Sequence, residues 1–71
     1  MFIQAVRRWC TQHSVKPSII DAVLHHVERT FLAENYEVLL DSLHAFEAYC
    51  AENDAIQVWS YFHAEYVGAD Q

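Results

Sequence analysis

The sequence predicts an all-α fold, a small bundle of three to four short antiparallel helices in a single domain that spans residues 1–71. Three observations predict it. Apolar residues recur at intervals of three and four, which is the period of an α-helix. The chain has one glycine and one proline, fewer turn residues than strands joined by tight turns need. The links between the apolar stretches are short, and short links favour antiparallel neighbours.

The first predicted helix runs from about Phe2 to His13. The segment from Ser14 to Pro17 ends it, because a proline disfavours helical geometry in the residue before it. The helix is short enough to pack beside the others or across the ends of a three-helix core. Its apolar face comprises Phe2, Ala5, Val6, Trp9 and Cys10.

The second helix is expected to begin at Ser18, because Ser18 and Asp21 have the spacing of a capping box, with Asp in place of the usual Glu. It should end near Ala33 or Glu34, with Asn35 as the boundary. Its apolar stripe comprises Ile20, Val23, Leu24, Val27 and Phe31.

The third helix is expected from about Tyr36 to Ala51. A polar turn follows it, in which Asn53 or Asp54 can cap the next helix. The predicted inner face comprises Leu39, Leu40, Leu43, Phe46 and Cys50.

The fourth helix, from about Ala55 to Val67, is the most informative segment. Gly68 suits the position just past its C-terminus. The helix is apolar on nearly every side, which indicates either a central position in the fold or a shared surface with a partner. We assign Trp59, Phe62 and Tyr66 to the core. The predicted interface residues of this helix are Ile56, Val58, Tyr61 and Glu65.

Glu47 is a further candidate interface residue. On a helix it lies only about 40° from Leu43, the centre of the predicted apolar face. A buried carboxylate needs a partner, so one interpretation is an ion pair within the chain at the edge of the core. The other is a charged position on a binding surface.

Charge limits the class of partner. The formal net charge is −6, from four basic and ten acidic residues. Nucleic acid and anionic lipid attract Lys and Arg, so direct binding to either is disfavoured. No run approaches the roughly 20 apolar residues of a membrane span, and the N-terminus lacks the basic-then-apolar order of a signal peptide. We therefore expect a cytoplasmic protein.

The sequence also predicts that the protein is not an enzyme and holds no cofactor or metal. It has neither a nucleophile motif nor a glycine-rich phosphate loop. Cys10 and His13 lie one turn apart, as do Glu47 and Cys50, but a zinc site would require the two pairs to converge from two helices. We expect both cysteines to be free thiols in the core.

These observations favour a small acidic protein-binding module, an adaptor, inhibitor or chaperone-like regulator that masks a site on a larger protein. Hydrophobic residues make up 54% of the chain, more apolar surface than a few short helices readily hide. The first alternative is a structural homodimer that associates through the last helix. The second is an acidic mimic of nucleic acid, of the kind used by phages and bacterial antagonists.

Overall fold

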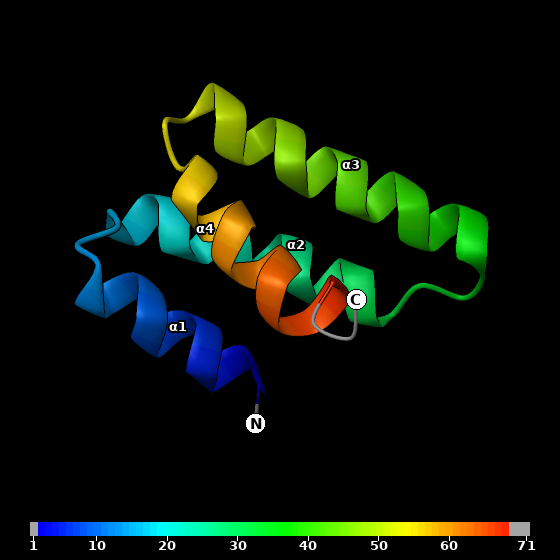
Figure 1. Ribbon diagram of the computed structural model, residues 1–71, viewed down its shortest axis with the longest axis horizontal. Coiled ribbons are helices and arrows are strands. Elements are labelled where there is room, and N and C mark those ends of the chain that lie inside the picture. Colours follow the sequence, from blue (N-terminus) through cyan, green and yellow to red (C-terminus); the bar gives the residue numbers. More distant parts are fainter. Residues whose placement is uncertain (1, 69–71) are drawn as a thin grey trace.

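The computed structural model describes residues 2–68, which form a helical bundle (Figure 1). The elements are α1 (Phe2–Gln12), α2 (Pro17–Phe31), α3 (Tyr36–Glu52), α4 (Ile56–Phe62) and the π-helix η1 (His63–Val67), which continues α4. Successive helices run in opposite directions, and α4 lies in front of α2, between α1 and α3 (Figure 1). The predicted all-α class is confirmed.

Two of the predicted helix boundaries shift for local reasons. Lys16 is extended, with φ −62° and ψ 141°, as expected for a residue that precedes proline. The helix then begins at Pro17 instead of Ser18, because the fixed φ of proline suits the first helical position. Ser18 forms no capping box, since Lys16 is the N-cap and makes no side-chain capping hydrogen bond. At its other end α2 stops at Phe31, short of the expected Ala33 or Glu34.

Asn35, predicted only as the boundary after the second helix, also caps α3, and the predicted role of Asn53 and Asp54 is corrected. The Asn35 side chain accepts a hydrogen bond from the Val38 N–H at 2.9 Å, so Asn35 caps the start of α3. Asn53 caps the end of α3 instead of the start of α4, because its Nδ2 donates to the carbonyl oxygen of Tyr49 at 2.9 Å. The N-cap of α4 is Ala55, which has no side chain able to cap.

Helices α1 and α3 end in the same motif without a glycine. Ser14 and Asp54 have positive φ values of 59° and 56°. The following N–H groups, of Val15 and Ala55, donate to the carbonyl oxygens of Cys10 and Cys50 at 3.0 and 2.8 Å. This six-to-one hydrogen bond, with a left-handed residue inside it, is the Schellman arrangement.

The core lies where α4 meets the other three helices. Phe46 of α3 is fully buried, and its ring centroid lies 5.1 Å from that of Phe62 and 5.5 Å from that of Trp59. The buried hydrophobic residues are Val6, Cys10, Ile20, Val23, Val27, Phe46, Cys50, Ala55, Val58 and Phe62.

This core corrects the expected orientation of α4. Val58 has no exposed surface, so the expectation that it points away from the core is wrong. Ala55, Val58 and Phe62 are spaced three and four residues apart and form the inward stripe of the helix. Trp59, one position further along, is consequently only partly buried.

Candidate protein-binding groove

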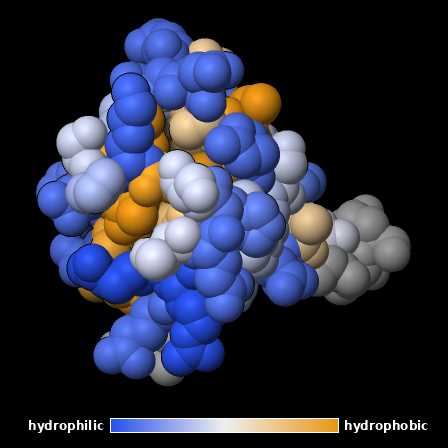
Figure 2. Space-filling model, turned by 90° about the vertical axis from the view of Figure 1, so that its left-hand side faces the viewer, coloured by the Kyte–Doolittle hydropathy of each residue, from blue (hydrophilic) through white to orange (hydrophobic). Residues whose placement is uncertain are grey.

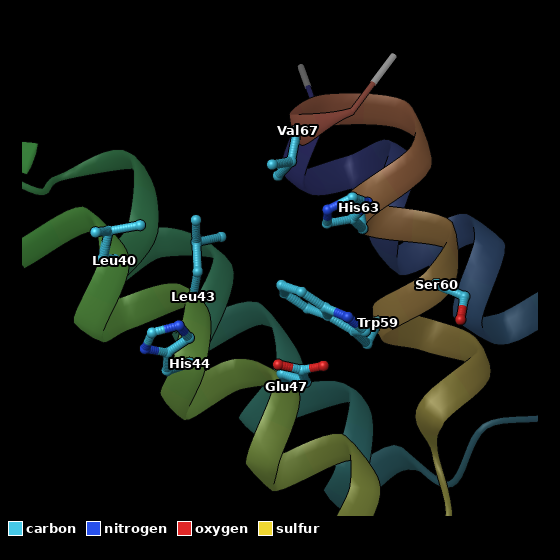
Figure 3. A pocket seen from close by; sticks show the side chains of 8 residues that line it. All are labelled: Leu40, Leu43, His44, Glu47, Trp59, Ser60, His63 and Val67. Atoms are coloured by element: carbon cyan, nitrogen blue, oxygen red, sulfur yellow. The ribbon is translucent and has the colours of Figure 1, made fainter. Parts of the chain in front are cut away.

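A groove of about 540 Å³ runs between α3 on one side and α4 with η1 on the other. Figure 3 shows the side chains of both walls on either side of the groove. The α3 wall consists of Leu40, Leu43, His44 and Glu47, and the opposite wall consists of Trp59, Ser60, His63 and Val67.

The groove exists because α3 and α4 meet at the turn that joins them and diverge towards η1 (Figure 1). The face of α3 that enters the core carries Ser42, Phe46 and Cys50. Leu43 lies about 60° and Leu40 about 120° around the helix from Phe46, and both remain only partly buried. The sequence pattern assigned both leucines to the inner face. Leu43 does pack against the core, and both leucines also line the groove.

A second hollow, of about 370 Å³, adjoins the groove at the end where η1 lies. Leu43 and Val67 line both spaces, so the two hollows are neighbours that share these two side chains. The remaining residues of the second hollow are Thr30, Phe31, Leu39, Phe62 and Tyr66. The hydroxyl of Thr30 donates to the carbonyl oxygen of His26.

Exposed apolar side chains gather around the groove and the second hollow. Phe31 is 44% exposed, Val67 38% and Tyr66 37%, and all three line the second hollow. Leu32 and Tyr36, in the adjoining link and the first turn of α3, are also largely exposed. The opposite end of the molecule, which carries the two Schellman turns, presents a mainly hydrophilic surface with a narrow apolar strip (Figure 2). The apolar surface is therefore concentrated at the η1 end.

The π-helix sets the geometry of one groove wall. The Gly68 N–H donates to the carbonyl oxygen of His63 at 2.7 Å, five residues back, which widens the last turn. A Cβ atom on Gly68 would lie 3.0 Å from Cε1 of the His63 ring. Glycine at this position therefore lets the chain close against His63, which lines the groove together with Val67. Gly68 follows the helix end as predicted, although its φ of −105° is not left-handed.

Charge is distributed unevenly between the two halves of the chain. The basic residues Arg7, Arg8, Lys16 and Arg29 all precede residue 30, whereas residues 36–68 contain six acidic residues and no Lys or Arg. Both walls of the 540 Å³ groove belong to this acidic half. Within the groove itself the charged or ionisable side chains are Glu47, His44 and His63.

The structure brings only part of the predicted interface set to the groove. Glu47 is exposed in the α3 wall, so it is not a buried carboxylate in need of a partner. Ile56 is 46% exposed and lies one turn before Trp59 on the same side of α4. Tyr61 is partly buried against Trp9, and Glu65 is exposed in η1 but does not line the groove.

Sequence reasoning missed the groove-lining leucines, Trp59 and Val67. One available signal was the width of the apolar surface of α3, because Val38, Leu39 and Leu40 in succession point in three directions. The absence of basic residues after Arg29 was a second signal, because it marks the half of the chain that forms the groove as the acidic half.

The two cysteine thiols, the remaining reactive groups considered from the sequence, lie in the core. Cys10 and Cys50 are buried free thiols. Burial raises the pKa of Cys50 to about 11, against the lowering effect of a backbone hydrogen bond from Trp59, and burial also raises the pKa of Cys10.

Among residues 2–68, no three His, Cys, Asp or Glu side chains are grouped in a way that would hold a metal ion. No helix within the same residues is both long and apolar enough to cross a membrane.

Comparison with protein-family models, with curated proteins and with solved structures finds no match to this chain. The class that the fold defines is a small all-α bundle with an open apolar groove on its acidic half.

Proposed function

We propose that this chain is a protein-binding module and that the groove between α3 and α4–η1 receives an apolar segment of a larger partner. One observation carries the proposal: the groove and the second hollow share Leu43 and Val67, and the exposed apolar side chains of Phe31, Tyr66 and Val67 lie around them. Scattered apolar residues are normal on a protein surface, but exposed apolar side chains gathered in one place are typical of an interaction site.

The proposed role is that of an adaptor, inhibitor or chaperone-like regulator acting in the cytoplasm. Trp59 supports this role, since it is partly buried in the groove wall and tryptophan is enriched among residues that dominate binding energy. Leu40, Leu43 and Val67 would contribute the surrounding contact area.

A homodimer through the last helix has weaker support. Of the three apolar residues expected at such an interface, Val58 is buried and Tyr61 packs on Trp9, which leaves Ile56 substantially exposed. Two copies facing each other through the acidic half would also bring like charges together, which costs free energy. Light scattering after size exclusion at micromolar concentration should therefore give the mass of a monomer, 8.3 kDa.

A matched pair of valines tests the proposed site. Val67 lines the groove and is 38% exposed, whereas Val38 is 43% exposed and lies on the side of α3 opposite to Leu40 and Glu47. Val67→Asp and Val38→Asp change the net charge equally. We expect a protein that is captured from a lysate of the native host by the wild type and by Val38→Asp to be lost with Val67→Asp.

The captured protein should then be purified and titrated against the three forms, with circular dichroism as the check that each variant is folded. The proposal predicts the same ranking of affinities in this direct assay. Equal binding by Val67→Asp and Val38→Asp would show that the groove is not the binding site.

A further inference from the structure

We infer that the occupant of the groove is a basic amphipathic helix, an inference that rests on the proposed function and specifies its partner. The argument depends on three features of the described residues: the secondary structure of the groove walls, their length and the distribution of charge around them.

The walls exclude recognition through the backbone. Both walls are helices, whose interior N–H and C=O groups are already hydrogen-bonded along the helix. No strand is present among residues 2–68 to which an extended peptide could add. A partner must therefore be recognised through its side chains, and an amphipathic helix presents a continuous row of apolar side chains to such a groove.

The dimensions suit a short helix. The α3 wall runs from Leu40 to Glu47 and the opposite wall from Trp59 to Val67, so each is about two helical turns long. A third helix placed between two diverging helices packs as a further member of the bundle, with its axis about 8–10 Å from each neighbour. Two turns accommodate apolar anchors at positions i, i+3 or i+4, and i+7.

The charge distribution selects a basic helix. Glu47 lies in the groove wall, and Glu37 is exposed on α3 about 60° around the helix from Leu40. The half of the chain that forms the groove has no Lys or Arg to attract an acidic partner. Lys or Arg residues that flank the apolar row of a bound helix would therefore meet carboxylates on α3, and complementary charge gives both specificity and fast association.

Synthetic peptides test this inference. The first is a helix of about 14 residues with Leu at spacings of three and four and Lys at the other positions. The second has the same leucines with Gln in place of Lys, and the third contains the residues of the first in scrambled order. Binding is measured by calorimetry with the wild type and by the emission of Trp59 in Trp9→Phe, a variant in which Trp59 is the one tryptophan.

We expect the Lys peptide to bind at least about tenfold more tightly than the Gln peptide at low salt, with the difference shrinking as salt screens the charges. The scrambled peptide should bind more weakly than the ordered one. Val67→Asp should reduce the affinity for the uncharged Gln peptide, whose binding depends on apolar contact, and Val38→Asp should leave it unchanged.

Charge reversal at two positions locates the electrostatic contribution. Glu47→Lys removes a carboxylate from the groove wall, and Glu28→Lys makes the same change in net charge on α2, outside the groove. We expect about a tenfold loss of affinity for the Lys peptide with Glu47→Lys and a much smaller loss with Glu28→Lys. Equal losses would mean that net charge alone attracts the peptide, and would overturn the inference.

The two proposals fail in different ways. If the Gln peptide binds as tightly as the Lys peptide and both lose affinity with Val67→Asp, the basic partner is wrong while the groove remains a binding site. If neither ordered peptide distinguishes Val67→Asp from Val38→Asp, the helical partner is overturned. The capture experiment with the same two variants then decides separately whether the groove binds protein at all.

Discussion

The indole ring of Trp9 in α1 stacks on the phenol ring of Tyr61 in α4, with ring centroids 4.5 Å apart and 11° between the ring planes. Trp9 also stacks on His13, with ring centroids 3.9 Å apart, and His13 Nδ1 is hydrogen-bonded to the carbonyl oxygen of Trp9. Tyr61 therefore ties α1 to α4 within the chain, although it is not fully buried.

This stack predicts a structural role for Tyr61. We expect Tyr61→Ala to lower the free energy of unfolding by about 2 kcal/mol, since it removes both packing area and an aromatic pair. Tyr61→Phe keeps the ring and should cost much less. Urea unfolding followed by circular dichroism measures both. An unchanged stability for Tyr61→Ala, together with lost partner binding, would instead support the interface role predicted from the sequence.

The second prediction concerns His26, which lies against the rings of Phe46 and Tyr49 at centroid distances of 5.7 and 5.2 Å. Burial lowers the pKa of His26 below its ordinary value of 6.5, and the nearby charges of Arg29 and His25 lower it further. Below pH 6.5 the unfolded chain therefore binds a proton before the folded chain does. The contribution of His26 to stability is present above that pH and is lost as the pH falls towards the folded pKa.

His26→Phe is expected to remove this contribution to the pH dependence. The difference in unfolding free energy between pH 7.5 and 5.5 should be smaller in the variant than in the wild type. The variant should also be more stable by about 1 kcal/mol at pH 7.5, because Nδ1 of His26 is buried without a hydrogen-bond partner among residues 2–68. An equal difference between the two pH values in His26→Phe and in the wild type would contradict the prediction.

The third prediction concerns the two thiols. Cys50 is fully buried and its pKa is raised to about 11, so at pH 8 its thiolate population is about 100-fold lower than that of a thiol with the ordinary pKa. We expect Cys10 and Cys50 to react with Ellman's reagent only as fast as the chain opens, and to react rapidly in urea. Fast reaction of either thiol in the native protein would contradict the buried positions.

The fourth prediction uses the left-handed residue at the end of α1. Ser14 has a φ of 59°, a conformation that glycine adopts without the steric penalty of a Cβ atom. We expect Ser14→Gly to raise the free energy of unfolding by about 0.5–1 kcal/mol. Ser18→Gly, at an exposed position within α2, is the matched control and should lower it by about 0.5 kcal/mol. Denaturant unfolding of both variants gives the two values, and a loss of stability in Ser14→Gly would contradict the prediction.

The ends of the helices show how far local sequence signals reach. Asn35 was recognised as a boundary but not as the cap of α3, although that cap needs only the N–H of Val38, three residues away. Pro17 was recognised as a break, yet it also starts α2, since the same fixed φ serves both purposes. The ends of α1 and α3 at Ser14 and Asp54 carried a weaker signal, because neither left-handed residue is a glycine.

The sequence by itself determined the helical class, the approximate extent of each helix and the excess of apolar residues, because these depend on periodicity and on neighbours a few positions apart. Only the tertiary structure decided that Val58 faces inward, that Tyr61 packs on Trp9, and that Leu43 and Val67 line the same groove. On a helix that is apolar all round, the buried side is chosen by the positions of the neighbouring helices. Those positions result from packing between residues distant in the chain, which the local pattern does not contain.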